Sequence, residues 1–153
     1  MTDGGIVMDH QGREIKRFDV RDGHGIRLLM RAGLQVGLVT GRSSRVVAHR
    51  AKDLGIRMVY QNAFDKLVVY QKIKKKTGLR DREIAYFGDD VVDLPVLRRV
   101  GLAIAVRDAE ENVRKCAHYV TKQGGGNGAV REVVDLLLRV QGRWEAVVKK
   151  YFE

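Results

Sequence analysis

Acidic side chains crowd one point of the sequence. Asp89, Asp90 and Asp93 lie within five residues of one another, directly after an apolar run at residues 84–87. Carboxylates this close repel each other unless a cation neutralises them, and hard oxygen ligands with open coordination positions suit Mg²⁺. One aspartate here would serve equally well as a helix cap, but two adjacent ones and a third favour a metal site.

Three other segments carry groups that suit an anion. Thr40-Gly41-Arg42 offers a hydroxyl, an approachable backbone N–H and a cation, which together suit phosphate at a helix start. The same three residues would also make an ordinary cap and turn. Lys66 carries a point charge at a helix start, where the helix dipole does not favour a cation, although surface lysines are common there. The glycine-rich run at 124–128 predicts either an anion-binding nest or a plain loop, and taken alone it favours the loop.

The elements that must position these groups alternate between short strands and helices. Strands are predicted at 35–39, 56–59, 84–87, 102–105 and 119–120, and helices at 22–32, 43–54, 65–77, 91–99, 109–116 and 128–140. This alternation indicates βα units and a parallel sheet, which makes the fold class α/β, Rossmann-like, with helices on both faces. Ligands bind outside the carboxyl ends of such strands, and both Thr40 and Asp89 follow a strand end.

Two segments lie outside this alternation. Short strands at 5–8 and 14–18 around a turn at residues 9–12 predict an N-terminal β-hairpin. Residues 141–153 form an amphipathic tail that holds Trp144, Tyr151 and Phe152. Packing against the tail's own domain or against a neighbouring subunit is the simpler role for those aromatic side chains.

The composition fits a single domain. The chain has 153 residues, of which 44% are apolar, enough for a hydrophobic core. No apolar run approaches the length of about 20 residues that a membrane helix needs, and no signal peptide is apparent. One cysteine, Cys116, excludes an internal disulfide and favours a cytoplasmic location.

The positive charge is spread along the chain. The formal net charge is +10, and lysines are densest at residues 72–76. A basic surface of this kind would suit nucleic acid or an anionic small substrate. No aromatic side chains that would stack on bases are interleaved with these lysines, so a solvated helix face is the better interpretation. We therefore expect no nucleic acid among the partners.

Taken in order, the motifs resemble the haloacid dehalogenase superfamily of phosphohydrolases from its second motif onward. The order is an apolar strand then Thr40-Gly41-Arg42, a helix opening with Lys66, and an apolar strand then Gly88-Asp89-Asp90 with Asp93. The resemblance narrows to the 3-deoxy-D-manno-octulosonate 8-phosphate (KDO 8-phosphate) phosphatases. The segments that narrow it include Asp3-Gly4-Gly5, Arg21-Asp22-Gly23-His24-Gly25-Ile26, Asp93-Leu94-Pro95 and Gly125-Gly126-Asn127-Gly128.

The resemblance implies a Mg²⁺-dependent phosphatase without a cap domain. Its substrate would be a small anionic sugar phosphate, hydrolysed to KDO and inorganic phosphate for lipopolysaccharide synthesis. Residues 1–153 would form one domain of a homotetramer, with the hairpin at 5–18 joining subunits and a C-terminal tail at 141–153. A phosphatase of a related nine-carbon sugar acid phosphate remains an alternative, as does a non-catalytic assembly or ligand-binding module.

The resemblance also implies roles for individual residues. Thr40 would bind the transferring phosphoryl group, and Lys66 would neutralise its charge. Asp89 would bind Mg²⁺, and Asp90 would share or support the metal. The substrate-binding set would be Gly41, Arg42, Arg21, His24, Gly125 and Gly126.

One motif of the superfamily is missing. Its members carry Asp-x-Asp on the first strand, where the first aspartate attacks phosphorus and the second is the general acid–base. In this family that motif runs on into a segment that matches Thr2-Asp3-Gly4-Gly5, so Asp3 is not the nucleophile. We therefore expect an N-terminal truncation, from a start assigned too late, that removes a central strand between those ending at Thr40 and Gly88.

Overall fold

In a computed structural model, which describes residues 2–153, the chain folds into two compact units. Among the described residues, the first unit comprises 2–38, Ser44–Val59 and Gly126–Glu153. The second comprises Val39–Ser43 and Tyr60–Gly125. The metal and phosphate candidates Thr40, Lys66 and Asp89 all belong to the second unit.

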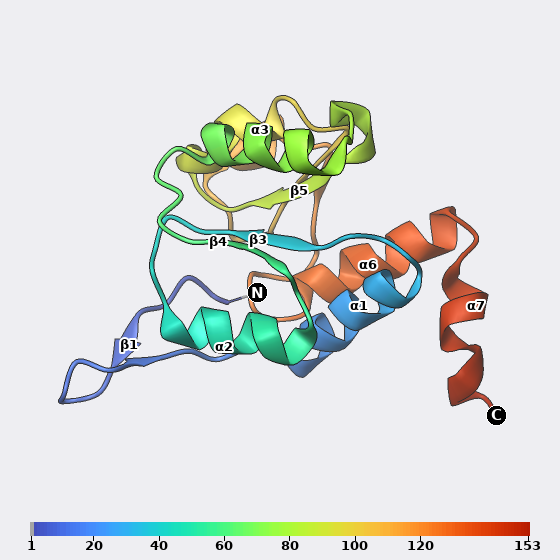
Figure 1. Cartoon of the computed structure of the whole chain (residues 1–153), viewed down its shortest axis with the longest axis horizontal. Helices are drawn as coiled ribbons and strands as arrows, with labels where there is room; N and C mark the ends of the chain where they lie inside the picture. Colours follow the sequence, from blue (N-terminus) through green and yellow to red (C-terminus); the bar gives the residue numbers. More distant parts are fainter. Residues whose placement is uncertain (1) are drawn as a thin grey trace. The chain divides into compact units, whose positions relative to one another are not determined.

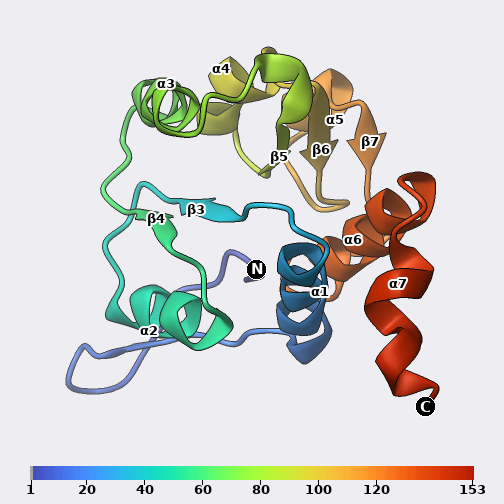
Figure 2. The ribbon, with the colours of Figure 1, turned by 45° about the vertical axis from the view of Figure 1, so that its right-hand side comes forward.

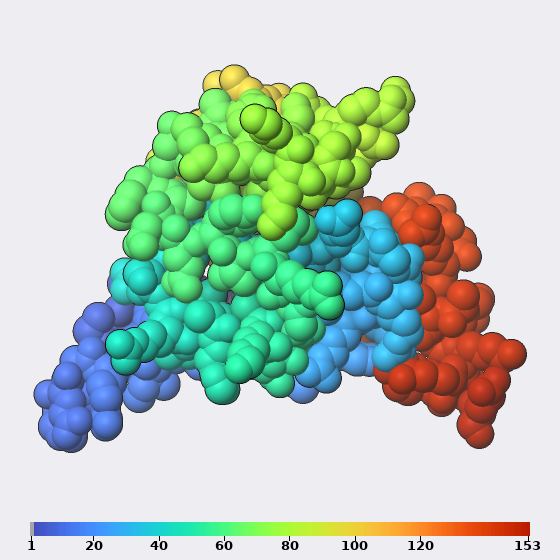
Figure 3. Space-filling view, viewed as in Figure 1, coloured from blue at the N-terminus to red at the C-terminus, as the bar shows by residue number. Residues whose placement is uncertain are grey.

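The first unit opens with the predicted hairpin, whose strands are shorter than expected. β1 (Val7–Met8) pairs antiparallel with β2 (Glu14–Ile15). Asp9 Oδ1 closes the turn by accepting two backbone N–H groups, each at 2.9 Å. The hydroxyl of Ser44, just before α2, donates to Glu14 and ties the base of the hairpin to the unit. Glu14 also pairs with Lys16 of the hairpin at 3.0 Å. The rest of the hairpin stands out from its unit (Figure 3).

Helices form the core of the first unit. They are α1 (Val20–Arg31), α2 (Arg45–Leu54), α6 (Ala129–Val140), α7 (Trp144–Val148) and the 3₁₀ turn η3 (Lys149–Tyr151). α1 lies beside α6 (Figure 1), where Leu28 packs with Val134 and Leu138 in one buried cluster. The predicted helix starts and ends agree with these bounds to within about two residues, the usual precision of helix ends.

The pair β3 (Gly37–Val39) and β4 (Met58–Tyr60) forms a two-stranded sheet. Each strand begins in the first unit and ends in the second. Ala51 and Leu54 of α2 pack with Ile56, just before β4, in a buried cluster of the first unit.

The second unit is built on a parallel sheet of three strands, ordered β5-β6-β7 (Figure 2). In chain order its elements are α3 (Lys66–Thr77), η1 (Asp81–Glu83), β5 (Ala85–Gly88), η2 (Val91–Asp93), α4 (Leu94–Leu97), β6 (Leu102–Ala105), α5 (Glu111–Cys116) and β7 (Tyr119–Val120). Gly88 pairs with Ala105, and Ala105 with Val120, so the three strand ends are in register. The predicted α/β class with parallel strands is confirmed.

Burial differs between the strands of this sheet. On β6, Ala103, Ile104 and Ala105 are all 0% exposed, because the strand has a partner on both sides and helices over it. β5 is only partly buried. Within residues 2–153, β5 pairs with β6 alone and β3 with β4 alone, so each of these two strands keeps one unpaired edge.

The helix predicted at 91–99 is the element that differs most from expectation. It is a 3₁₀ turn, η2, followed by the single helical turn of α4. The carboxylate of Asp93 accepts the N–H groups of Asp89 and Asp90, which tightens the backbone before the helix begins. Across residues 2–153, no helix combines the length and apolar character that crossing a bilayer requires.

Candidate active site

Asp93 is the centre of a buried polar cluster at the end of β5. Its side chain is 1% exposed, and Lys66 Nζ lies 2.6 Å from Oδ1. Tyr86 donates its hydroxyl to the same oxygen at 2.7 Å. Oδ2 accepts the backbone N–H of Asp89 at 3.2 Å and of Asp90 at 3.4 Å. One carboxylate therefore fixes both the candidate phosphate-binding lysine and the loop of the candidate metal ligands.

Gly88 makes this arrangement sterically possible. A Cβ at position 88 would lie 2.8 Å from Asp93 Cβ and 2.8 Å from Leu97 Cδ1, closer than real atoms approach. Any larger residue would push the carboxylate of Asp93 away from the end of β5. The Gly-Asp-Asp sequence therefore has a packing reason for its first residue.

Asp89 and Asp90 are exposed at the end of β5. Crowding by nearby protein atoms and the charge of Asp93 raise the pKa of the Asp89 carboxyl, and Lys66 partly opposes this rise. Asp90 caps the following turn by accepting Val91 N–H at 2.7 Å. The loop thus concentrates negative charge where a cation would relieve the repulsion.

The donor set fits Mg²⁺ better than a cation that needs a full protein cage. Within residues 2–153, no three His, Cys, Asp or Glu side chains stand together as a ready-made metal site. Mg²⁺ commonly takes only one or two carboxylates and completes its shell with water and substrate phosphate. Asp89 and Asp90 can supply these carboxylates, while Asp93 is already engaged by Lys66 and Tyr86.

Thr40 begins a turn that is anchored within the second unit. Its N–H donates to Tyr60 O, and its carbonyl accepts from Ala63 N–H, both at 2.9 Å. Thr40 Oγ1 accepts the N–H of Arg42 at 3.2 Å, which leaves the hydroxyl hydrogen available to a ligand. A Cβ at Gly41 would meet only Ala63 O, at 3.8 Å, so no protein atom presses on this glycine from within the fold.

The glycine-rich run has protein partners of its own. Gly125 N–H donates to Asp108 Oδ1 at 2.8 Å in the second unit. In the first unit, Gly126 has a φ of +65°, and a Cβ there would lie 2.6 Å from the carbonyl carbon of Thr2. The close approach of Thr2 gives a packing reason for a glycine at 126, and the contact of Gly125 and Gly126 with substrate stays a prediction.

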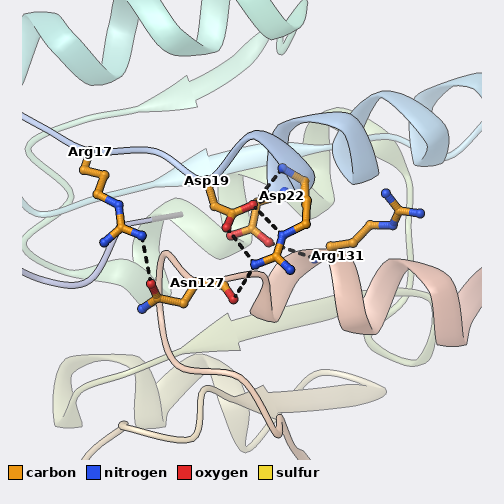
Figure 4. A network of polar contacts seen from close by, with 6 residues as sticks. Arg17, Asp19, Asp22, Asn127 and Arg131 are labelled. Atoms are coloured by element: carbon orange, nitrogen blue, oxygen red, sulfur yellow. Dashed lines mark hydrogen bonds and ion pairs between the residues drawn. The ribbon is translucent and has the colours of Figure 1, made fainter.

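Arg21 and His24 belong to α1 in the first unit. Arg21 Nη2 lies 3.1 Å from Asp19 Oδ2 and 3.3 Å from the carbonyl oxygen of Asn127, while Arg17 donates to the side chain of Asn127 at 3.2 Å (Figure 4). The hydrogen bond that Arg21 donates to Asp19 raises the pKa of the Arg21 guanidinium. This network holds the start of α1 against the loop before α6.

His24 faces the C-terminal tail. Its Nε2 lies 2.9 Å from the hydroxyl of Tyr151, and its Nδ1 lies 3.3 Å from Arg131 Nη1. Burial, and then the positive charges of Arg131 and Arg31, lower the pKa of His24. His24 therefore helps to anchor the tail, and its predicted contact with substrate stays a prediction.

The second unit thus brings Lys66, Asp89 and Asp90 together around Asp93 and also holds the Thr40 turn. Sequence reasoning grouped Asp93 with the metal candidates, whereas the structure turns its carboxylate toward Lys66 and Tyr86. It missed Tyr86 altogether. The available signal was a phenol within an apolar strand, because a buried hydroxyl needs a hydrogen-bond partner.

Comparison with known proteins identifies the class. Residues 56–133 match the family model of haloacid dehalogenase-like hydrolases. The chain belongs to this family of hydrolases.

Within the family, the relatives are KDO 8-phosphate phosphatases, as the motifs predict. The 3-deoxy-D-manno-octulosonate 8-phosphate phosphatase of Yersinia pestis is 46% identical over 145 residues, which cover 95% of this chain and 78% of that protein. The Moraxella catarrhalis phosphatase of the same name, solved with magnesium, phosphate and KDO, is 40% identical with a TM-score of 0.95, covering 98% of this chain and 86% of that one. A probable phosphatase from Pseudomonas syringae is 44% identical with a TM-score of 0.96, covering 99% and 86%.

Proposed function

We propose that this chain is the binding frame of a Mg²⁺-dependent phosphatase that releases phosphate from KDO 8-phosphate. The observation that carries the proposal is the single carboxylate of Asp93, which holds Lys66 at 2.6 Å and fixes the loop of Asp89 and Asp90. A cation and two carboxylates fixed at one strand end suit a phosphate and its metal. The Moraxella catarrhalis relative binds magnesium, phosphate and KDO.

Each group has a definite task in this proposal. Thr40 donates its hydroxyl to the phosphoryl group, and Lys66 neutralises the charge on its oxygens. Arg42 suits the substrate carboxylate, because a guanidinium pairs with a carboxylate through two parallel hydrogen bonds. Asp89 and Asp90 would hold Mg²⁺, which supplies positive charge to the phosphoryl oxygens when bound.

A phosphatase of this kind also requires a nucleophile that attacks the phosphorus atom. The 153 residues contain no Asp-x-Asp sequence, so we propose that the nucleophile and the acid–base carboxylate are not among them. The unpaired edges of β3 and β5 support this, because each leaves backbone N–H and C=O groups that an added strand would satisfy. An Asp-x-Asp strand supplied by coding sequence upstream of Met1 would provide both.

The test measures phosphate release from KDO 8-phosphate with Mg²⁺, with and without EDTA. We expect no turnover by the 153 residues and EDTA-sensitive turnover by a form extended through the upstream codons. Asp89→Asn in the extended form should abolish that turnover. Robust turnover by the 153 residues would refute the missing nucleophile, and an inactive extended form would indicate a non-catalytic module. A nine-carbon sugar acid phosphate in the same assay tests the choice of substrate.

We also propose a cytoplasmic homotetramer assembled through the hairpin. Four apolar side chains of the hairpin are between 54% and 56% exposed, an unusual concentration of apolar surface on so short a segment: Ile6, Val7, Met8 and Ile15. Val7→Asp should lower the mass measured by light scattering after gel filtration. Val20→Asp is the matched control, because Val20 is 78% exposed but lies outside the hairpin. An unchanged mass for Val7→Asp would exclude the hairpin as the interface.

A further inference from the structure

Tyr86 is a buried polar side chain that the proposed function leaves unused. It lies on β5, and its hydroxyl donates to Asp93 Oδ1 at 2.7 Å. Lys66 Nζ contacts the same oxygen at 2.6 Å. Tyr86, Asp93 and Lys66, called the inner triad below, therefore meet at one atom.

Sharing this oxygen has a geometric consequence. A carboxylate oxygen has two acceptor positions, and the inner triad fills both of them on Oδ1. The ammonium of a lysine is a point charge on a flexible stem, so it does not by itself fix the direction of the carboxylate. The phenol is rigid and belongs to a paired strand, so its O–H bond fixes where the oxygen lies.

We propose that Tyr86 is a positioning residue that acts through Asp93 to hold the ammonium of Lys66 in place for the phosphoryl group. This assignment rests on the proposed function, because it presumes that Lys66 contacts phosphate. Tyr86 itself touches neither phosphate nor metal. Its hydroxyl limits the positions that the Asp93–Lys66 ion pair can take.

The substitution Tyr86→Phe isolates the hydroxyl. The ring of Tyr86 packs against the buried apolar cluster of the second unit, which includes Val96 and Leu97. Phenylalanine keeps that packing and removes only the hydrogen bond to Asp93. Oδ1 then keeps Lys66 as its one partner, and the carboxylate gains freedom to rotate.

The second unit also contains a natural control. Tyr70 donates to Asp81 Oδ1 at 2.5 Å, and Lys74 Nζ lies 2.5 Å from the same oxygen. This outer triad of Tyr70, Asp81 and Lys74 has the same three residue types but no group proposed for phosphate or metal. Tyr70→Phe therefore removes an equivalent hydrogen bond away from the candidate site.

The first measurement is the affinity of the 153-residue chain for inorganic phosphate at saturating Mg²⁺, by titration calorimetry. We expect Lys66→Met to weaken binding at least tenfold and Tyr86→Phe about fivefold, the equivalent of one hydrogen bond. In the double variant Tyr86→Phe should add nothing to Lys66→Met, because its effect passes through the lysine. Tyr70→Phe should bind phosphate as the wild type does.

The second measurement needs no ligand. Relaxation of the lysine side-chain ¹³Cε signals should show greater mobility of Lys66 in Tyr86→Phe and no change at Lys66 in Tyr70→Phe. If Lys66→Met binds phosphate normally, the proposed function fails and this role of Tyr86 falls with it. If Lys66→Met weakens binding while Tyr86→Phe changes neither affinity nor Lys66 mobility, only the assignment of Tyr86 is overturned. The assignment of Tyr86 would also be overturned if Tyr86→Phe weakened phosphate binding equally in the wild type and in the Lys66→Met variant.

Discussion

The inner and outer triads use the same chemistry in different surroundings. In the inner triad the side chains of Asp93 and Lys66 are 1% and 12% exposed. In the outer triad those of Asp81 and Lys74 are 45% and 25% exposed. Both tyrosines are largely buried, and burial is the main cause that raises the pKa of each phenol. The two triads therefore differ chiefly in how much water reaches their charges.

This difference in exposure to water distinguishes an ion pair that can hold a ligand-binding lysine from an ordinary ion pair at the surface. Water solvates the outer charges when they part, so the outer ion pair is replaceable. The inner charges lack that alternative, and each depends on the other to offset the loss of hydration. Asp93 also binds two backbone N–H groups, so its position is set from both of its oxygens. Lys66 is held in one position, as a ligand-binding group must be, whereas Lys74 is held loosely, as is usual for a lysine at the surface.

The largest expected effect comes from removing the inner carboxylate. Asp93→Ala leaves Lys66 buried without a counter-charge and two loop N–H groups without an acceptor. We expect a loss of about 3–5 kcal/mol in the free energy of unfolding, measured in urea, with loss of phosphate binding. Asp81→Ala should lose far less and bind phosphate normally. Equal losses of stability would show that burial does not distinguish the triads.

Two glycines offer a steric way to disturb each triad separately. A Cβ at Gly88 would overlap Asp93, and a Cβ at Gly101 would overlap the backbone of Arg82, next to Asp81. We expect each alanine substitution to destabilise the fold by about 1–3 kcal/mol through overpacking. Only Gly88→Ala should weaken phosphate binding in calorimetry. Weakened binding in Gly101→Ala would mean that strain spreads across the whole unit.

A high salt concentration should also distinguish the inner ion pair from the outer one. Charges exposed to solvent are screened over about 10 Å at 0.1 M salt and about 3 Å at 1 M, while buried pairs are screened much less. The destabilisation caused by Lys74→Met should therefore shrink toward zero in 1 M NaCl. That caused by Lys66→Met should persist. The check is thermal unfolding of both variants and the wild type at the two salt concentrations.

The smallest expected effect is a pH dependence of the outer triad. Hydrogen bonds from Lys74 and Tyr70 lower the pKa of Asp81 below its usual value of 3.8. Its contribution to stability is therefore complete above that value and is lost as the pH falls below it. The stability difference between wild type and Asp81→Asn should be constant at pH values well above 3.8 and should shrink as the pH falls below 3.8. A difference that grows on acidification would contradict the sign of this shift.

Local patterns predicted the fold well. β6 at 102–105 and β7 at 119–120 have the predicted bounds, because short apolar runs between turn signals report strands directly. The helix predicted at 91–99 was wrong in form, because the side chain of Asp93 reshapes the backbone around it. A pattern of apolar residues cannot show which way a carboxylate turns.

The candidate site was predictable only where its residues follow strands. Thr40 and Asp89 follow apolar runs, so strand ends alone point to them. Lys66 and Asp93 are 27 positions apart, and only tertiary structure brings them into contact. The glycine run was harder still, since its close contacts are with Thr2 and Asp108. Glycines have no side chains, so their sequence pattern does not indicate which residues they contact.

The two N–H groups that donate to Asp93 make the site's closure observable in solution. Hydrogen exchange at the amides of Asp89 and Asp90 requires these bonds to open. A rotation of the carboxylate that frees these amides also moves it relative to Lys66. Deuterium uptake at the two amides would therefore set an upper limit on how often the carboxylate turns away from Lys66.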